Sequence, residues 1–106
     1  MVNMSKRKKL IRKKFRDDVF HRDGYKCVFC EETENLDAHH ITDRSLMPNG
    51  GYVKENGISV CQEHHFECEK YHITEGKEWV KGKHPDDLYC IIGSSKETAI
   101  SKSERL

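Results

Sequence analysis

Apolar residues with helical spacing mark the first predicted element of the chain. Ile11, Phe15 and Val19 recur every four residues, which places them on one stripe of a helix predicted over residues 9–21. The opposite face of this helix is basic. An Asp-Gly pair at positions 23–24 then predicts a turn that ends the helix.

Two short strands are predicted beyond a tight knuckle at residues 27–30. Residues 35–41 are predicted to form the first strand, in which alternate side chains point to opposite faces. One face carries Leu36, Ala38 and His40, and the other carries Asp37, His39 and Ile41. A loop with a Pro-Asn-Gly-Gly turn covers residues 42–55, and residues 57–60 form the second strand.

The rest of the chain predicts one clear helix and a weaker element. Residues 62–72 are rich in Gln, Glu and Lys, which favour a helix, and Gly76 ends it. Residues 79–92 predict a short helix or strand. We therefore expect a flexible basic arm at 1–8, a folded domain at 9–92 and a frayed polar tail at 93–106.

Composition indicates that this domain needs a covalent or metal crosslink. Only 35% of the 106 residues are hydrophobic, and the mean hydropathy is −0.87, so the apolar core is thin. No apolar run approaches a membrane span, and we expect a soluble protein of the bacterial cytoplasm. Thiols stay reduced there, so the five cysteines point to a metal rather than to disulfides.

Two ligand pairs with matching spacing predict a structural zinc site. In each pair two residues separate the ligands, which lets one turn bring both side chains to a tetrahedral ion. The predicted ligands are Cys27, Cys30, Cys61 and His64. Cys68, one helical turn after His64, is the alternative fourth ligand, and Cys90 is expected to be a small core residue.

Charge is distributed unevenly along the chain. Residues 1–16 carry eight Lys or Arg and no acid, whereas the remainder carries eleven Lys or Arg against eighteen Asp or Glu. A basic segment on an acidic body is typical of nucleic-acid binding, although a solvated tail has the same composition. The residues expected to contact DNA phosphates are Lys8, Lys9, Arg12, Lys13 and Arg16.

Further histidines and one asparagine are interleaved with the zinc ligands. His39-His40 precede Asn56, and His65 directly follows His64. In this order and spacing, residues 15–69 resemble the HNH endonuclease family in its zinc-stapled branch. The segment 22–27 resembles the entry to many such domains, and Asn56 stands five residues before Cys61, as in the family.

The resemblance implies an α+β fold of the ββα-metal type and cleavage of DNA phosphodiester bonds with one catalytic divalent cation. By position, His40 would be the general base, and His39 and His65 would bind the cation. Asn56 would be the family's central Asn, which braces the loop or, in some branches, touches the metal.

Two departures from the family pattern change the expected metal preference. The fourth zinc ligand is His64 where Cys is commoner, and His39 stands where many relatives have Asp. Because imidazole is softer than carboxylate, we expect Mn²⁺, Co²⁺ or Ni²⁺ to support cleavage at least as well as Mg²⁺. Glu69, one turn after His65, could join the cation's ligands directly or through water, although a solvated glutamate on the helix face is the favoured interpretation.

Binding is expected to be largely independent of DNA sequence, because no separate reading module accompanies the domain. A partner protein would then supply target specificity, and the small size suggests a phage or mobile-element origin. The competing hypothesis is a non-catalytic zinc-binding module that binds nucleic acid. No role is predicted for His21, His72 or His84.

Overall fold

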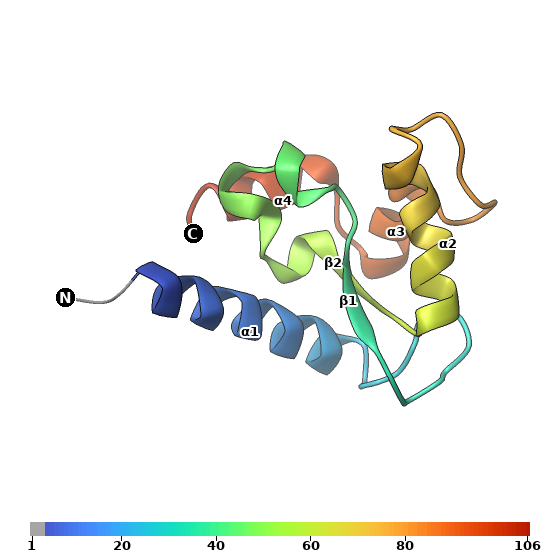
Figure 1. The fold of residues 1–106 in the computed structure, drawn as a ribbon, viewed down its shortest axis with the longest axis horizontal. Coiled ribbons are helices and arrows are strands. Elements are labelled where there is room, and N and C mark those ends of the chain that lie inside the picture. The colour runs from blue at the N-terminus through green and yellow to red at the C-terminus, as the bar shows by residue number, and fades with distance from the viewer. Residues whose placement is uncertain (1–3) are drawn as a thin grey trace.

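Two antiparallel strands lie at the centre of the fold, with a long helix on one side and a shorter helix on the other (Figure 1). This computed structural model describes residues 4–106. The helices and strands in chain order are α1 (Met4–Arg22), β1 (Asp37–His40), β2 (Gly57–Val60), α2 (Gln62–Ile73), α3 (Pro85–Ile92) and α4 (Lys96–Ser103). The α+β class expected from the sequence is confirmed.

The strand register brings the predicted chemistry into the middle of the molecule. His39 lies opposite Ile58, and His40 lies opposite Gly57. All of β2 is buried, since helices cover both of its faces. Three short 3-10 turns, at Arg44–Leu46, Pro48–Gly51 and Lys54–Asn56, connect the strands and replace the irregular loop expected there.

Helix α1 is longer than its apolar stripe predicted. It begins at Met4, so residues 4–8 of the expected flexible arm are helical, while residues 1–3 lie outside the described residues. Lys and Arg have high helix propensity, which explains why the basic segment continues the helix. Phe15 and Val19 are buried against the sheet, where Gly57 presents no side chain: a Cβ there would lie 2.5 Å from Val19 Cγ2.

The end of α1 is tied to β2 by polar contacts. Arg22 donates to the carbonyl oxygens of Lys54 and Gly57, at 2.6 and 2.7 Å. The carboxylate of Asp23 accepts the backbone N–H of Ser59 at 2.8 Å. These bonds fix the angle at which α1 crosses the sheet.

The C-terminal segment folds back over the loop, and the expectation of a frayed tail from residue 93 was wrong. His84 and Asp87 form a capping box at the start of α3, and Gly93 ends it with a φ of 68°. Ser95 then caps α4, which buries Ala99 and Ser103. Asn49 donates to the carbonyl oxygen of Ser103 at 3.0 Å, joining α4 to the Pro48–Gly51 turn.

Candidate functional site

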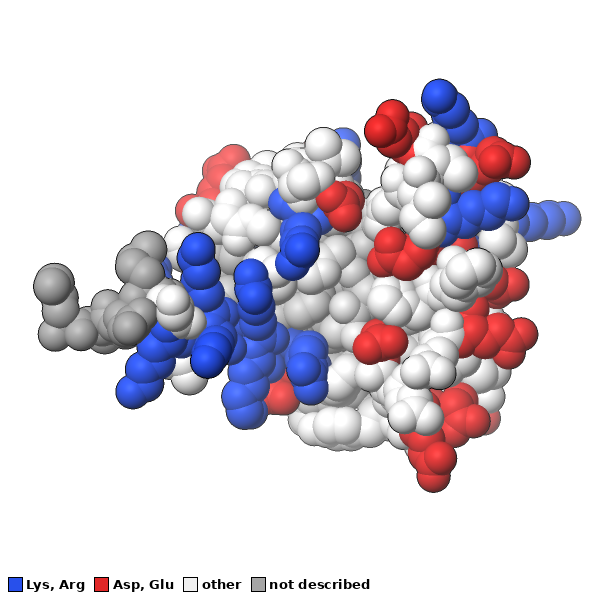
Figure 2. Space-filling view, in the orientation of Figure 1, with Lys and Arg blue, Asp and Glu red and all other residues white. Residues whose placement is uncertain are grey.

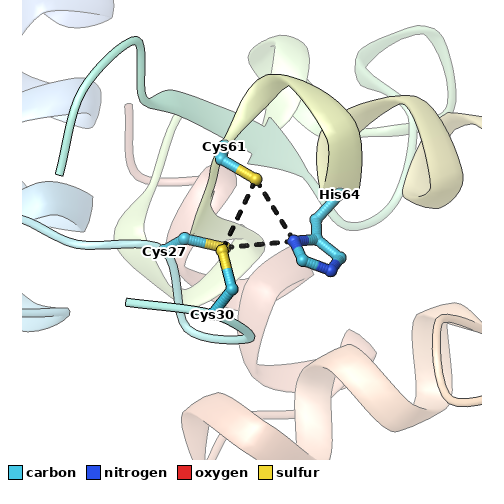
Figure 3. A group of neighbouring side chains, drawn as sticks. All are labelled: Cys27, Cys30, Cys61 and His64. Atoms are coloured by element: carbon cyan, nitrogen blue, oxygen red, sulfur yellow. Dashed lines mark hydrogen bonds between the residues drawn. The ribbon is translucent and has the colours of Figure 1, made fainter. Parts of the chain in front are cut away.

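The four predicted zinc ligands converge on one point (Figure 3). Their donor atoms all lie within 4.8 Å of one another. Cys61 Sγ lies 3.2 Å from His64 Nδ1 and 3.8 Å from Cys30 Sγ, and Cys27 Sγ lies 3.6 Å from the same imidazole nitrogen. Three sulfurs and one imidazole nitrogen are a donor set that suits tetrahedral zinc.

Local backbone geometry explains why these residues meet. The knuckle closes through the N–H of Cys27, which donates to the Glu32 carbonyl at 2.8 Å, and the N–H of Val28 donates to Ser59 on β2 at 3.1 Å. Cys61 sits at the N-cap of α2 in an extended conformation. His64 follows on the first turn, so its side chain comes back toward the Cys61 sulfur.

Ionisation of Cys27 favours metal binding at this cluster. Burial opposes ionisation of the thiol, but hydrogen bonds from the backbone N–H groups of Cys61, Phe29 and Cys30 outweigh it and lower the pKa of Cys27 to about 7. Cys68, the alternative ligand, is buried outside the cluster, and burial raises the pKa of its thiol to about 12. The geometry therefore favours His64 as the fourth ligand. Cys90 is exposed rather than in the core as expected.

A second group of potential metal ligands joins β1 to α2. The donor atoms of His39, His65 and Glu69 lie within 4.8 Å of one another. Glu69 Oε1 is 3.1 Å from both His39 Nδ1 and His65 Nε2. The side chain of Glu69 is 36% exposed and is held between two imidazoles. The expectation that Glu69 is simply a solvated helix-face residue was therefore wrong.

The electrostatics of this cluster keep a carboxylate available as a ligand. Hydrogen bonds with His39 and His65 hold the pKa of the Glu69 carboxyl well below its usual range. The same contact with Glu69 raises the pKa of His65. Burial lowers the pKa of His39, despite its contact with Glu69. Asp37, 3.2 Å from His65 Nδ1, holds that ring with Nε2 toward Glu69.

His40 lies beside this cluster between two aromatic rings. Its imidazole stacks on Phe15 of α1 at a centroid distance of 4.5 Å and meets the edge of Tyr52 at 4.7 Å. Burial, with smaller contributions from His39 and Arg44, lowers the pKa of His40 to about 4. Its buried Nε2 makes no hydrogen bond within the described part of the chain.

His40 and the second cluster open onto the same small pocket. This pocket of about 200 Å³ is lined by His40, Asp43, Arg44, His65, Glu69 and His72, together with Ala38. His39 itself is 1% exposed and is not among the residues that line this pocket. A neutral imidazole thus faces the space next to a group of cation ligands.

Asn56 is fully buried and braces the loop between the strands. Its Oδ1 accepts the N–H of Thr42 at 3.0 Å and the hydroxyl of Tyr89 at 2.7 Å. Its Nδ2 donates to the carbonyl oxygens of Thr42 and Gly51, at 3.1 and 3.2 Å. All four hydrogen-bonding positions of the amide are occupied. Of the two roles expected for Asn56, the geometry supports bracing the loop.

His72 belongs to the site, although no role was predicted for it. Its Nε2 lies 3.0 Å from the carbonyl oxygen of His40, and its ring stacks on His39 at a centroid distance of 5.2 Å. The sequence spacing could have predicted this role, because residues four and seven positions after His65 lie on the same face of a helix. Glu69 and His72 occupy those positions in α2.

The predicted DNA-binding residues lie in different surroundings. Figure 2 shows Lys and Arg side chains gathered over α1, with Asp and Glu concentrated around α2 on the other side of the view. Lys8 and Arg12 line a pocket next to Tyr52 and Arg44. Lys13 pairs with Asp17 at 2.5 Å on the exposed surface. Lys9 and Arg16 are exposed outside these contacts.

Comparisons with family models, curated proteins and solved structures find no match for this chain. Among residues 4–106, no helix combines the length and apolar character needed to cross a membrane.

Proposed function

We propose that this protein is a metal-dependent endonuclease of the ββα-metal type, which hydrolyses phosphodiester bonds in DNA. The observation that carries the proposal is the second ligand cluster, His39, His65 and Glu69, of which His65 and Glu69 line one pocket with His40. A purely structural zinc protein has no need for this second cluster. Two imidazoles that hold one ionised carboxylate between them are an arrangement of perturbed titratable groups that is typical of functional sites.

The residues of the second cluster fit a catalytic cation. Two imidazoles and one carboxylate suit Mn²⁺, Co²⁺ or Ni²⁺ at least as well as Mg²⁺. These three residues would hold the cation, which when bound would stabilise the negative charge that develops during phosphodiester hydrolysis. Asp37 and His72 act through the ligands, because they orient the rings of His65 and His39.

His40 acts as the general base. With a pKa lowered to about 4, its imidazole is neutral near pH 7 and can accept the proton of the attacking water. The negative phosphate of a bound substrate raises this pKa toward the working range, since it stabilises the protonated ring. The rings of Phe15 and Tyr52 hold the imidazole in place between them.

The zinc cluster supports the site mechanically. It connects the knuckle at Cys27 and Cys30 to the start of α2. The same helix carries His65 directly after His64, and Glu69 one turn later. Zinc bound to the first cluster thereby fixes the helix that presents two ligands of the second.

Plasmid cleavage tests this proposal. Wild type and His40→Ala are incubated with supercoiled DNA and Mg²⁺, Mn²⁺, Co²⁺ or Ni²⁺, with EDTA as the baseline. We expect nicked or linear product that requires metal and falls by at least about 100-fold in the variant. Strict dependence on Mg²⁺ would contradict His39 as a ligand.

The alternative is a zinc-binding module that binds nucleic acid without cutting it. It is supported by the Cys3His cluster and the basic helix, neither of which needs His40. Inactivity of both proteins with every metal, while zinc and DNA remain bound, would favour this alternative. Under either function we propose low sequence specificity, with a partner protein selecting the target.

A further inference from the structure

We infer that Arg12, Arg44 and Tyr52 form a subsite for a backbone phosphate that flanks the bond to be cut. The inference rests on the proposed nuclease function and names how its substrate strand is held. Arg44 and Tyr52 lie in the connection between β1 and β2, far in sequence from the basic residues of α1.

Tyr52 is the centre of this arrangement. Its hydroxyl accepts a hydrogen bond from Arg44 Nη1 at 3.2 Å, and the Arg12 guanidinium carbon lies 5.5 Å from its ring centroid. The same ring meets His40 edge-on at 4.7 Å. One aromatic side chain therefore positions two guanidinium groups next to the general base.

The two arginines line a hollow that suits an anion. This pocket of about 380 Å³ is lined by Lys8, Arg12 and Arg44, with Ser45 and Asn49 as further polar residues. No Asp or Glu lies among its lining residues in the part of the chain that the structure describes. A second, larger pocket along α1 is less suited to an anion, because acidic residues, Asp18 and Glu55, line it together with the basic ones.

Arg44 connects this hollow to the catalytic pocket. It lines both the pocket with Arg12 and the pocket with His40 and Glu69. A strand whose scissile phosphate lies at the ligand cluster would therefore place a neighbouring phosphate against Arg44 and Arg12. Guanidinium groups bind phosphate oxygens through paired hydrogen bonds and read no base identity.

Helix α1 thus has two linked tasks. Arg12 lies on one turn of α1, and Phe15, which stacks on His40, lies on the next. The helix that binds the phosphate also holds the general base. Binding at the subsite and alignment of His40 therefore depend on the same rigid element.

Charge-neutralising variants test the subsite directly. Arg12→Gln and Arg44→Gln each remove one exposed guanidinium, so folding should be retained. Lys81→Gln is the matched control, since it removes one positive charge from an exposed position between α2 and α3. Tyr52→Phe keeps the ring against His40 and Arg12 but removes the hydroxyl that receives Arg44.

Two measurements separate binding from chemistry. The first measurement gives KM and kcat for plasmid nicking. The second gives the affinity for a short DNA duplex at several salt concentrations. For this second measurement every protein also carries His40→Ala, so that the duplex is not cleaved. Each arginine variant should raise KM about tenfold with little change in kcat. Each should also reduce the slope of log affinity against log salt by about 1. Tyr52→Phe should change affinity in the same direction by less.

Arginine variants that match Lys81→Gln in KM and in salt slope would overturn the subsite. If the wild type never cuts DNA, but both arginine variants have a smaller slope of log affinity against log salt than the wild type, the nuclease is overturned. The phosphate site is still supported in that case. Equal losses of kcat in all variants, without a change in the salt slope, would also count against phosphate binding there.

Discussion

The side-chain amide of Asn56 makes four buried hydrogen bonds around the connection between the strands. It joins Thr42 just after β1 to Gly51 and to Tyr89 of α3. Each contact is buried, so water cannot replace a lost partner. The position of His40, two residues before Thr42, depends on this connection.

Asn56→Ala should therefore destabilise the protein rather than remove a catalytic group. We expect a loss of about 2–4 kcal/mol in the free energy of unfolding, because several buried groups lose their partner. Tyr89→Phe removes one of the four hydrogen bonds and should cost about 1 kcal/mol. Chemical denaturation followed by circular dichroism measures both. Loss of cleavage at unchanged stability and zinc content would instead place Asn56 in the chemistry.

If Glu69 is a ligand of the catalytic cation, replacing it should weaken cation binding. Glu69→Gln replaces the ionised carboxylate between His39 and His65 with a neutral amide. The Mn²⁺ concentration that gives half-maximal cleavage should rise by at least about tenfold, while zinc content stays constant. Glu63→Gln, which removes the same charge from an exposed position of α2, is the control. Identical metal titrations for the two variants would exclude Glu69 as a ligand.

At the scale of elements, α4 shows how a polar segment becomes part of the core. Ser95 accepts the N–H of Thr98 at 3.1 Å and starts the helix. Only Ala99 and Ser103 are buried among its residues, so the apolar stripe is narrow. Ala99 lies in the hydrophobic core and Ile100 packs against it, while the bond from Asn49 to the Ser103 carbonyl joins the helix to the Pro48–Gly51 turn.

A charge placed on each face of α4 tests this packing. Ala99→Asp puts a carboxylate at a position that is 0% exposed and should cost about 3–5 kcal/mol of folding free energy. Ser101→Asp, on the exposed face two residues later, should change stability by less than about 0.5 kcal/mol. Thermal or urea unfolding compares the two. Equal, small effects would mean that α4 is frayed in solution.

At the scale of the whole molecule, the zinc cluster compensates for a thin core. Only 35% of the residues are hydrophobic, and the cluster joins the knuckle to the start of α2. Such a crosslink can contribute about 10 kcal/mol or more to folding. The fold should therefore depend on the metal as a unit.

Cysteine variants distinguish the predicted zinc ligands from the cysteines outside the cluster. Cys61→Ser should lose the bound zinc and unfold at a much lower temperature, because one of the four ligands is gone. Cys90→Ser and Cys68→Ser should each retain one equivalent of zinc, since neither thiol belongs to the cluster. Metal analysis and thermal unfolding measure both properties. Zinc loss in Cys68→Ser with retention in a His64→Asn variant would reverse the ligand assignment.

The candidate site was predictable in its short-range parts. The Cys27 and Cys30 pair, and the Cys61 and His64 pair, were found from spacing alone, because ligands two residues apart meet wherever the chain makes one turn. The helix at Phe15 and Val19 was found for a similar reason, since its stripe follows the helical period. Its start at Met4 and helix α4 were not predicted, and residues 79–92 were left open between a helix and a strand, because these elements depend on caps and contacts outside the local pattern.

Residue types and spacings along the chain are enough to indicate an α+β domain with a cluster that could hold a metal and with a basic first helix, because these features depend on local geometry and on the distribution of charge. The places of Glu69, His72 and Arg44 depend on how the strands register and on which face of α2 meets β1. Folding brings these side chains to His39 and His40 from more than one element. Only that packing turns separate polar residues into one pocket.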